Sequence, residues 1–224
     1  MLAFELYELF GYVPRPELLR CDECEKKDEG IWDVLGYYVP RMEIVVLCES
    51  KIEGEIGELR ERLKKFGLDL NERETWLALR ELVRLHEHSH ALIHVCDFYG
   101  FSAPNREWYV NLSPSVNEPL TEFVAWSILQ HIKDMVLMRV FEAVDAKSPT
   151  FYHNWKEIKD ILVSKGVKES DQFEWVPPMI KLAREEEWRT FQEFKRGVEE
   201  HWDEISKMHN EEWTPTWVAW KVRK

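Results

Sequence analysis

Apolar residues recur with helical spacing in the first half of the chain. Between Trp76 and Val95 they fall three or four positions apart, which predicts a helix with one apolar face. Asn71, followed three residues later by Glu74, predicts where this helix begins. Because no Pro or Gly interrupts residues 72–99, we expect the helix to extend through that range.

The preceding segments predict a strand and a second helix. Residues 37–48 contain the apolar run Ile44-Val45-Val46-Leu47, which is typical of a strand. Residues 53–66 have the pattern of an amphipathic helix that ends at Gly67. Residues 1–35 are mixed in pattern and include a charged stretch that predicts a loop.

The rest of the chain predicts further helices. Residues 97–116 carry Gly and Pro and are expected to form a loop, with a short strand at Trp108–Val110. A long helix is expected from about residue 119 to residue 146. Residues 148–224 are Trp-rich and helical in pattern, and we expect them to pack on residues 1–147 as one globular unit. The predicted class is α+β, mostly helical with a small sheet.

The composition is that of a globular protein. Of 224 residues, 45% are hydrophobic and 32% are charged, which provides for a substantial core. The net charge of -12 argues against a nucleic-acid partner, since binding to phosphates needs a basic face. No apolar run reaches the length of a membrane span, and Glu5 and Glu8 interrupt the apolar N-terminal stretch, unlike a secretory signal. A cytoplasmic protein is the expectation.

Cysteine spacing is informative at one place only. Cys21 and Cys24 form a C-x-x-C pair, which suits a redox pair, a disulfide or half of a structural zinc site. Completing such a zinc site would require Cys48 and Cys96, which lie in a predicted strand and a predicted helix. The role of Cys21 and Cys24 therefore stays open.

The candidate chemistry lies in the predicted helix, where His86, Glu87 and His90 form the motif H-E-x-x-H. Residues four apart on a helix share one face and lie about 6 Å apart along the axis. His86 and His90 can therefore point their imidazoles at a single metal ion, and Glu87 can reach the outer face of that ion. A zinc ion and a carboxylate base arranged in this way activate water for peptide hydrolysis.

Two neighbouring histidines are not expected to bind the same ion. His88 is rotated by about 200° from His86 around the helix, and His94 lies about 12 Å from His86 along the axis. We expect His94 to be partly exposed, with a place along the cleft as the alternative. Glu87 and His90 also spell E-x-x-H, which is typical of di-iron bundles, but no other histidine follows a glutamate at this spacing.

A second motif follows in Asn117-Glu118-Pro119-Leu120-Thr121-Glu122. With H-E-x-x-H before it, this segment resembles the gluzincin metallopeptidases, the thermolysin-like and aminopeptidase-like families. In these, a second helix begins Asn-Glu-x-hydrophobic-Ser/Thr/Ala, often with an acidic residue four after the Glu. The resemblance implies a zincin-like fold, with Glu118 as the third zinc ligand and Glu122 as the carboxylate that orients a ligand histidine. It covers the two motifs and the stretch joining them.

Pro119 leaves a second assignment of the third ligand open. A residue before proline is disfavoured in the α region, so we expect Glu118 at the very start of its helix, with Pro119 at the first helical position. Glu122 is then firmly inside the helix and is the alternative third ligand. Both acids can also be explained as the usual enrichment in a first helical turn.

The resemblance also implies how a substrate is held. In gluzincins, a strand that precedes the motif helix borders the cleft, and an extended peptide can pair with its edge; here that strand is Ile44–Cys48. A donor is needed to stabilise the oxyanion of the tetrahedral intermediate. The candidates are Tyr109, His131, Tyr152 and His153, of which we prefer Tyr152 and His153.

Two functions are consistent with these observations. The first is a zinc-dependent peptidase with one zinc ion per chain, in which Glu87 is the general base and a peptide or protein is the substrate. The second is a non-catalytic zinc-binding regulatory or interaction protein of the same fold. Glu87 favours the enzyme, because a purely structural zinc site does not need it. The sequence predicts neither the cleavage specificity nor the oligomeric state.

Overall fold

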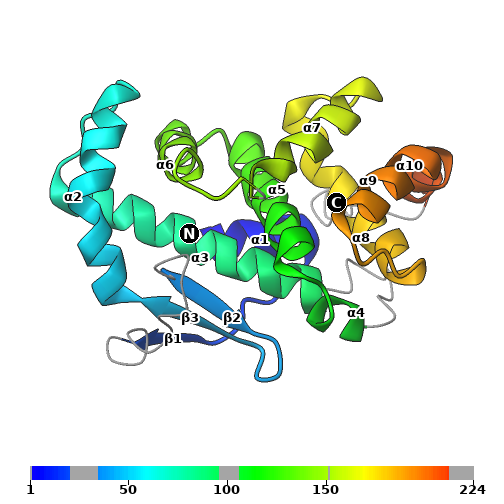
Figure 1. The fold of residues 1–224 in the computed structure, drawn as a ribbon, viewed down its shortest axis with the longest axis horizontal. Coiled ribbons are helices and arrows are strands. Elements are labelled where there is room, and N and C mark those ends of the chain that lie inside the picture. The colour runs from blue at the N-terminus through cyan, green and yellow to red at the C-terminus, as the bar shows by residue number, and fades with distance from the viewer. Residues whose placement is uncertain (1, 21–34, 96–105, 151, 212–224) are drawn as a thin grey trace, which may run out of the picture.

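A computed structural model describes residues 2–20, 35–95, 106–150 and 152–211. Over these residues the chain is mostly helical with one small sheet, the α+β class predicted above (Figure 1). In chain order the elements are α1 (Leu2–Phe10), β1 (Glu17–Arg20), β2 (Gly36–Val39), β3 (Ile44–Cys48), α2 (Glu49–Lys65), α3 (Glu72–Val95), α4 (Glu107–Val110), α5 (Pro114–Ile132), α6 (Met135–Asp145), η3 (Tyr152–Asn154), α7 (Trp155–Ser164), η4 (Glu169–Trp175), α8 (Val176–Glu185), α9 (Phe191–Glu200) and α10 (Trp202–Glu211).

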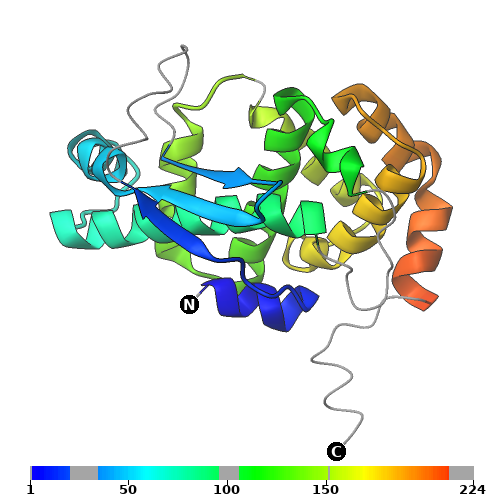
Figure 2. The ribbon, with the colours of Figure 1, turned by 90° about the horizontal axis from the view of Figure 1, so that it is seen from below.

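Helix α3 is the central element of the molecule. Its 24 residues make it about 36 Å long, and the sheet lies along one side of it while α5 and α6 lie on the other (Figures 1 and 2). Its predicted start is confirmed by two reciprocal hydrogen bonds between Asn71 and Glu74. The backbone N–H of Glu74 donates to Oδ1 of Asn71, and the backbone N–H of Asn71 donates to the carboxylate of Glu74, both at 2.9 Å. Residues 96–99, where we expected the helix to continue, lie outside the described residues.

The sheet has the strand order β1-β3-β2, with β3 parallel to β1 and antiparallel to β2. The expected single strand over residues 37–48 is therefore wrong, and the segment is a hairpin of β2 and β3. Pro40 has no N–H for a ladder, and the chain reverses there, with Met42 N–H donating to the Val39 carbonyl. Ile44–Cys48 is also not the edge strand: it is paired on both sides, and within the described part of the sheet β2 provides the edge nearest α5.

The long helix expected over residues 119–146 is two helices, α5 and α6. Helix α5 begins earlier than predicted because Ser113 and Pro114 form a favourable start, with the Ser113 carbonyl accepting from two backbone N–H groups and Pro114 at the first helical position. Pro119 consequently lies inside the helix. The break between α5 and α6 falls at Lys133, which is left-handed (φ 57°), and Asp134, whose side chain caps α6.

A strand was also expected at Trp108–Val110, and this prediction is wrong. These residues belong to the short helix α4, whose first carbonyl accepts from the backbone N–H of Asn111. A strand needs a neighbouring strand to satisfy its backbone, whereas a helical turn satisfies its own. Trp108 and Tyr109 are buried, and the Trp108 indole N–H donates to the Trp188 carbonyl at 2.8 Å.

The Trp-rich C-terminal helices share the core of the rest of the chain. Buried apolar side chains from α1 through α10 form one cluster, in which Trp155 packs against Trp126 and Phe141. None of the helices within the described ranges combines the length and the apolar character needed to span a bilayer. Cys48 is buried and disulfide-bonded, so it has no thiolate to offer a zinc site; the other three cysteines lie outside the described residues.

Candidate metal centre

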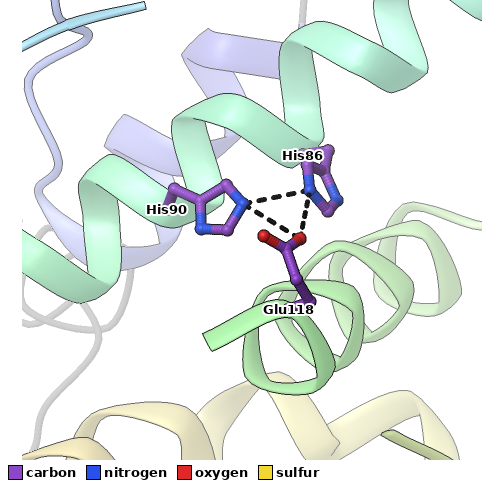
Figure 3. Close-up of side chains that lie close together, drawn as sticks. All are labelled: His86, His90 and Glu118. Atoms are coloured by element: carbon purple, nitrogen blue, oxygen red, sulfur yellow. Dashed lines mark hydrogen bonds and ion pairs between the residues drawn. The ribbon is translucent and has the colours of Figure 1, made fainter. Parts of the chain in front are cut away.

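Three side chains from two helices converge beside the centre of α3. His86 and His90 lie one turn apart on α3, and Glu118 approaches them from the second turn of α5 (Figure 3). The Nε2 atoms of the two histidines are 3.0 Å apart, and Glu118 Oε2 lies 3.2 Å from that of His86 and 3.4 Å from that of His90. The i, i+4 spacing predicted the histidine pair, and the crossing of α5 over α3 adds the carboxylate.

The separations of these three atoms suit a single zinc ion. Two ligand atoms held at 2.0–2.1 Å from zinc at a tetrahedral angle are about 3.3 Å apart, and all three pairs in this group are close to that value. Two imidazoles and one carboxylate are also a donor set that zinc accepts, and three protein ligands leave a fourth position for a water or a substrate. His86, His90 and Glu118 therefore fit the ion that the motif implies.

The electrostatics of the group match this reading. Burial would raise the pKa of Glu118, but His90 and His86 outweigh it and hold the pKa well below its usual range. Burial would lower the pKa of His86, but the carboxylates of Glu122 and Glu118 raise it well above its ordinary value. Glu118 is therefore ionised, and a metal ion at this position would compete with a proton for Nε2 of His86.

The second ring nitrogen of each of these two histidines also has polar neighbours. Glu122 Oε1 lies 3.3 Å from Nδ1 of His86. Nδ1 of His90 has three neighbours: the Asn117 Oδ1 at 3.0 Å, and the hydroxyls of Tyr109 and Thr121, each at 2.8 Å. Contacts of this kind fix the tautomer and ring orientation of a metal-binding histidine.

Tyr109, one of the candidate oxyanion donors, lines the same cavity as the metal-site group. Its hydroxyl lies 2.8 Å from Nδ1 of His90. Its ring also packs on His94 and Tyr38, with centroids 5.1 Å and 6.2 Å away. Tyr109 thus packs against the side of His90 that faces away from His86 and Glu118, and no local pattern in the sequence indicated that role.

Glu87 lies beside the group of His86, His90 and Glu118 and is not part of it. Its side chain is 5% exposed, and it lines the same cavity as His86, His90 and Glu118. Burial raises the pKa of Glu87, an effect that the neighbouring histidines oppose. A raised pKa makes this carboxyl group a better proton acceptor than an exposed glutamate, which suits a general base.

The cavity has a volume of about 750 Å3 and extends well beyond the metal centre. Residues of β2 form one wall, and residues of α5, α6 and η3 form the opposite wall, with α3 between them. Towards α2 its lining is largely apolar, with Leu59, Leu82 and Phe141, and this part also reaches the charged side chains of Arg62 and Lys147. Such a cavity is large enough for side chains of a bound peptide.

Of the other predicted oxyanion donors, the structure brings one to the site. Tyr152 lines the cavity and hydrogen-bonds to Glu118, and burial together with that carboxylate raises its pKa. His153 is not among the residues that line the cavity; its Nε2–H donates to the Asp145 carbonyl at 2.7 Å. His131 packs its ring on Phe173, with centroids 4.1 Å apart, and does not line the cavity either.

The two remaining histidines of α3 have partners elsewhere. His88 is fully buried and points to the other side of the helix, where Glu17 and the Tyr12 hydroxyl lie 3.0 and 2.8 Å from its two nitrogens. His94 is 6% exposed, so our expectation of a partly exposed side chain is wrong. Its Nδ1 lies 2.8 Å from the Tyr38 hydroxyl, and burial lowers its pKa to about 4.

Comparison with known proteins adds no relative to this description: no family model, curated protein or solved structure matches the chain. The resemblance to gluzincins therefore rests on the two motifs, and the geometry of the metal centre carries the functional argument.

Proposed function

We propose that this protein is a zinc-dependent peptidase with a zincin-like fold, in which His86, His90 and Glu118 hold one zinc ion. The observation that carries the proposal is the convergence of Glu118 on the histidine pair inside a cavity that also contains Glu87. A site with only a structural task would not need a buried carboxylate beside three ligands.

The chemistry divides between the ion and the chain. A bound zinc ion polarises the scissile carbonyl and makes a water more acidic. Glu87 is placed to accept a proton from the attacking water and to hand it to the leaving amine. Its raised pKa suits both steps, because the carboxyl group must take up and release the same proton.

Strand β2 is suited to hold the main chain of a peptide substrate. Cys48 N–H donates to the Leu35 carbonyl, which makes that pair a hydrogen-bonded one. Because hydrogen-bonded and non-bonded pairs alternate, the register directs the N–H and C=O of Gly36 and Tyr38 away from β3. Both residues line the cavity, so an extended peptide could pair with them.

Tyr152 completes the proposed machinery. Its hydroxyl hydrogen-bonds to Glu118, beside the position where the carbonyl oxygen of a bound peptide would develop negative charge. A tyrosine hydroxyl is protonated at neutral pH, so it can donate to that oxygen. In this proposal, Glu87 transfers the proton from the water to the leaving amine, and Tyr152 donates a hydrogen bond to the oxyanion.

The proposal is tested with the zinc-loaded protein and a diverse peptide library, analysed by mass spectrometry. We expect cleavage that chelation abolishes and that Glu87→Gln reduces by about 10²–10⁴-fold while zinc content is unchanged. The alternative, a non-catalytic zinc-binding protein, would show no cleavage at any temperature at which the protein stays folded, together with full zinc occupancy. That result would end the peptidase proposal.

A further inference from the structure

We propose that Gly36 is a positioning residue for Glu87: its lack of a side chain lets the edge strand β2 lie close enough to α3 to fix the Glu87 side chain. The inference rests on the proposed function, because it gives Glu87 the task of general base. The contact itself is independent of that function and can be measured without it.

The space around Gly36 is the first observation. A Cβ atom added there would lie 2.8 Å from Val83 Cγ1, 3.0 Å from Glu87 Cγ and 3.0 Å from the Val46 carbonyl oxygen. Gly36 is not in the left-handed region, where φ would itself favour glycine. The position therefore requires glycine because of the space available and not because of its backbone conformation.

The three neighbours differ in how easily they can move. The Val46 oxygen belongs to the central strand, which is paired on both sides. Val83 is branched at Cβ and only 7% exposed, so its side chain has little freedom. Glu87 has an unbranched side chain that reaches into the cavity. An added methyl group at residue 36 would therefore displace Glu87 or push β2 away from α3.

Gly36 also faces the proposed substrate. Its N–H and C=O point away from β3, by the register described above, and the residue lines the cavity. One residue thus leaves space for Glu87 where a Cβ atom would lie and offers its backbone to a bound peptide. The distance between substrate and base is set at this point, and an error of about 1 Å in such a distance can cost about 10²-fold in rate.

The metal ligands are not part of this contact. The nearest atoms to a Cβ at residue 36 come from Val83, Glu87 and Val46, and none comes from His86, His90 or Glu118. A substitution at Gly36 should therefore change catalysis while leaving zinc binding nearly intact.

The first experiment compares Gly36→Ala with Gly57→Ala, both zinc-loaded. Gly57 is an exposed residue of α2 at which an added Cβ meets nothing within 4 Å, so it is a matched control. We expect Gly36→Ala to lower kcat at least tenfold, with KM and the zinc Kd changed less than threefold. In a Glu87→Gln background, Gly36→Ala should cause no further loss of kcat, because the group it displaces is already inactive.

The second experiment needs no activity. Thermal unfolding of the zinc-loaded protein is measured for Gly36→Ala, Glu87→Ala and the double variant. Gly36→Ala should lower Tm by about 2–10 °C, as overpacking does in a chain of this size, and by clearly less when Glu87→Ala has removed the Cγ atom. If Gly36→Ala does not fold, the Val83→Ala substitution is added to every variant, because it removes the atom closest to the new methyl group. The same comparison with and without Glu87→Ala is then made in that background.

The outcomes separate the two proposals. Equal losses of Tm in both backgrounds, or a kcat loss that adds fully to that of Glu87→Gln, would overturn the role of Gly36. A third outcome is a protein that cleaves no peptide but in which Gly36→Ala lowers Tm less when Glu87 is replaced by Ala. That result would support the contact between Gly36 and Glu87 and would contradict the peptidase proposal.

Discussion

Glu122 and Glu118 lie against opposite nitrogens of the same imidazole. Glu122 Oε1 is 3.3 Å from Nδ1 of His86, while Glu118 Oε2 is 3.2 Å from its Nε2. Only Glu118 also lies close to His90, at 3.4 Å, which is why it belongs to the three-residue group and Glu122 does not. Glu118 faces the Nε2 atoms of both histidines and can share an ion with them. Glu122 faces only Nδ1 of His86, the nitrogen on the opposite edge of the ring, and from there it can orient the ring.

This arrangement predicts different effects for the two glutamates. Glu118→Ala removes a ligand and should abolish most zinc binding. Glu122→Ala should weaken it by about 10- to 100-fold, since the His86 ring loses its orienting carboxylate. Competition with a chromogenic chelator measures both affinities. The reverse order of severity would make Glu122 the ligand.

Zinc content should depend on the two histidines of the motif. The purified protein should carry about one zinc ion per chain, and His86→Ala and His90→Ala should each remove most of it. His201→Ala serves as the control, because that histidine lies at the end of α9 with its side chain 40% exposed. Full retention of zinc in the His86→Ala/His90→Ala double variant would mean that the metal lies elsewhere.

Tyr152→Phe should separate catalysis from metal binding. The variant keeps the ring but loses the hydroxyl that we propose as the oxyanion donor, so kcat of the zinc-saturated protein should fall by about 10²–10³-fold. Because the same hydroxyl hydrogen-bonds to Glu118, zinc affinity should weaken by at most about 10- to 100-fold, and kcat is therefore measured at saturating zinc. His153→Ala is the matched control, since that side chain hydrogen-bonds to the Asp145 carbonyl and does not line the cavity. A kcat within threefold of the unsubstituted protein would limit Tyr152 to packing.

Acid stability should depend on Glu17, on the far side of α3. A hydrogen bond from His88 and the nearby Arg84 guanidinium lower the pKa of Glu17, although burial opposes them. A carboxyl group whose pKa is lowered by folding stabilises the protein above its unfolded pKa, about 4.3, and this contribution is lost as the pH falls through the folded pKa.

Glu17→Gln should therefore lower the free energy of unfolding at pH 7 by about 1 kcal/mol, and the difference should shrink towards zero as the pH falls well below 4. Denaturant unfolding at several pH values measures it, with the exposed Glu53→Gln as control. A difference that stays constant with pH would show that the charge of Glu17 contributes nothing.

The local parts of the site could be predicted from the sequence, and the parts that depend on other elements could not. The cap at Asn71 and the shared face of His86 and His90 follow from contacts three or four residues apart. The start of α5 differs from the prediction because both Pro114 and Pro119 suit a first helical turn, and Ser113 with Pro114 forms the earlier start. The burial of His94 could not be predicted locally, because it involves Tyr38, a residue of β2.

Helix α3, its beginning and the neighbouring histidines within it could be predicted from the sequence, because they depend on the apolar periodicity and on contacts between residues three or four positions apart. Three relationships could not be predicted locally: β2 and not β3 lines the cavity, Gly36 leaves room for Glu87, and α5 crosses α3 where Glu118 meets both histidines. These relationships depend on strand order and helix packing, which are set by burial of side chains from distant segments in a common core.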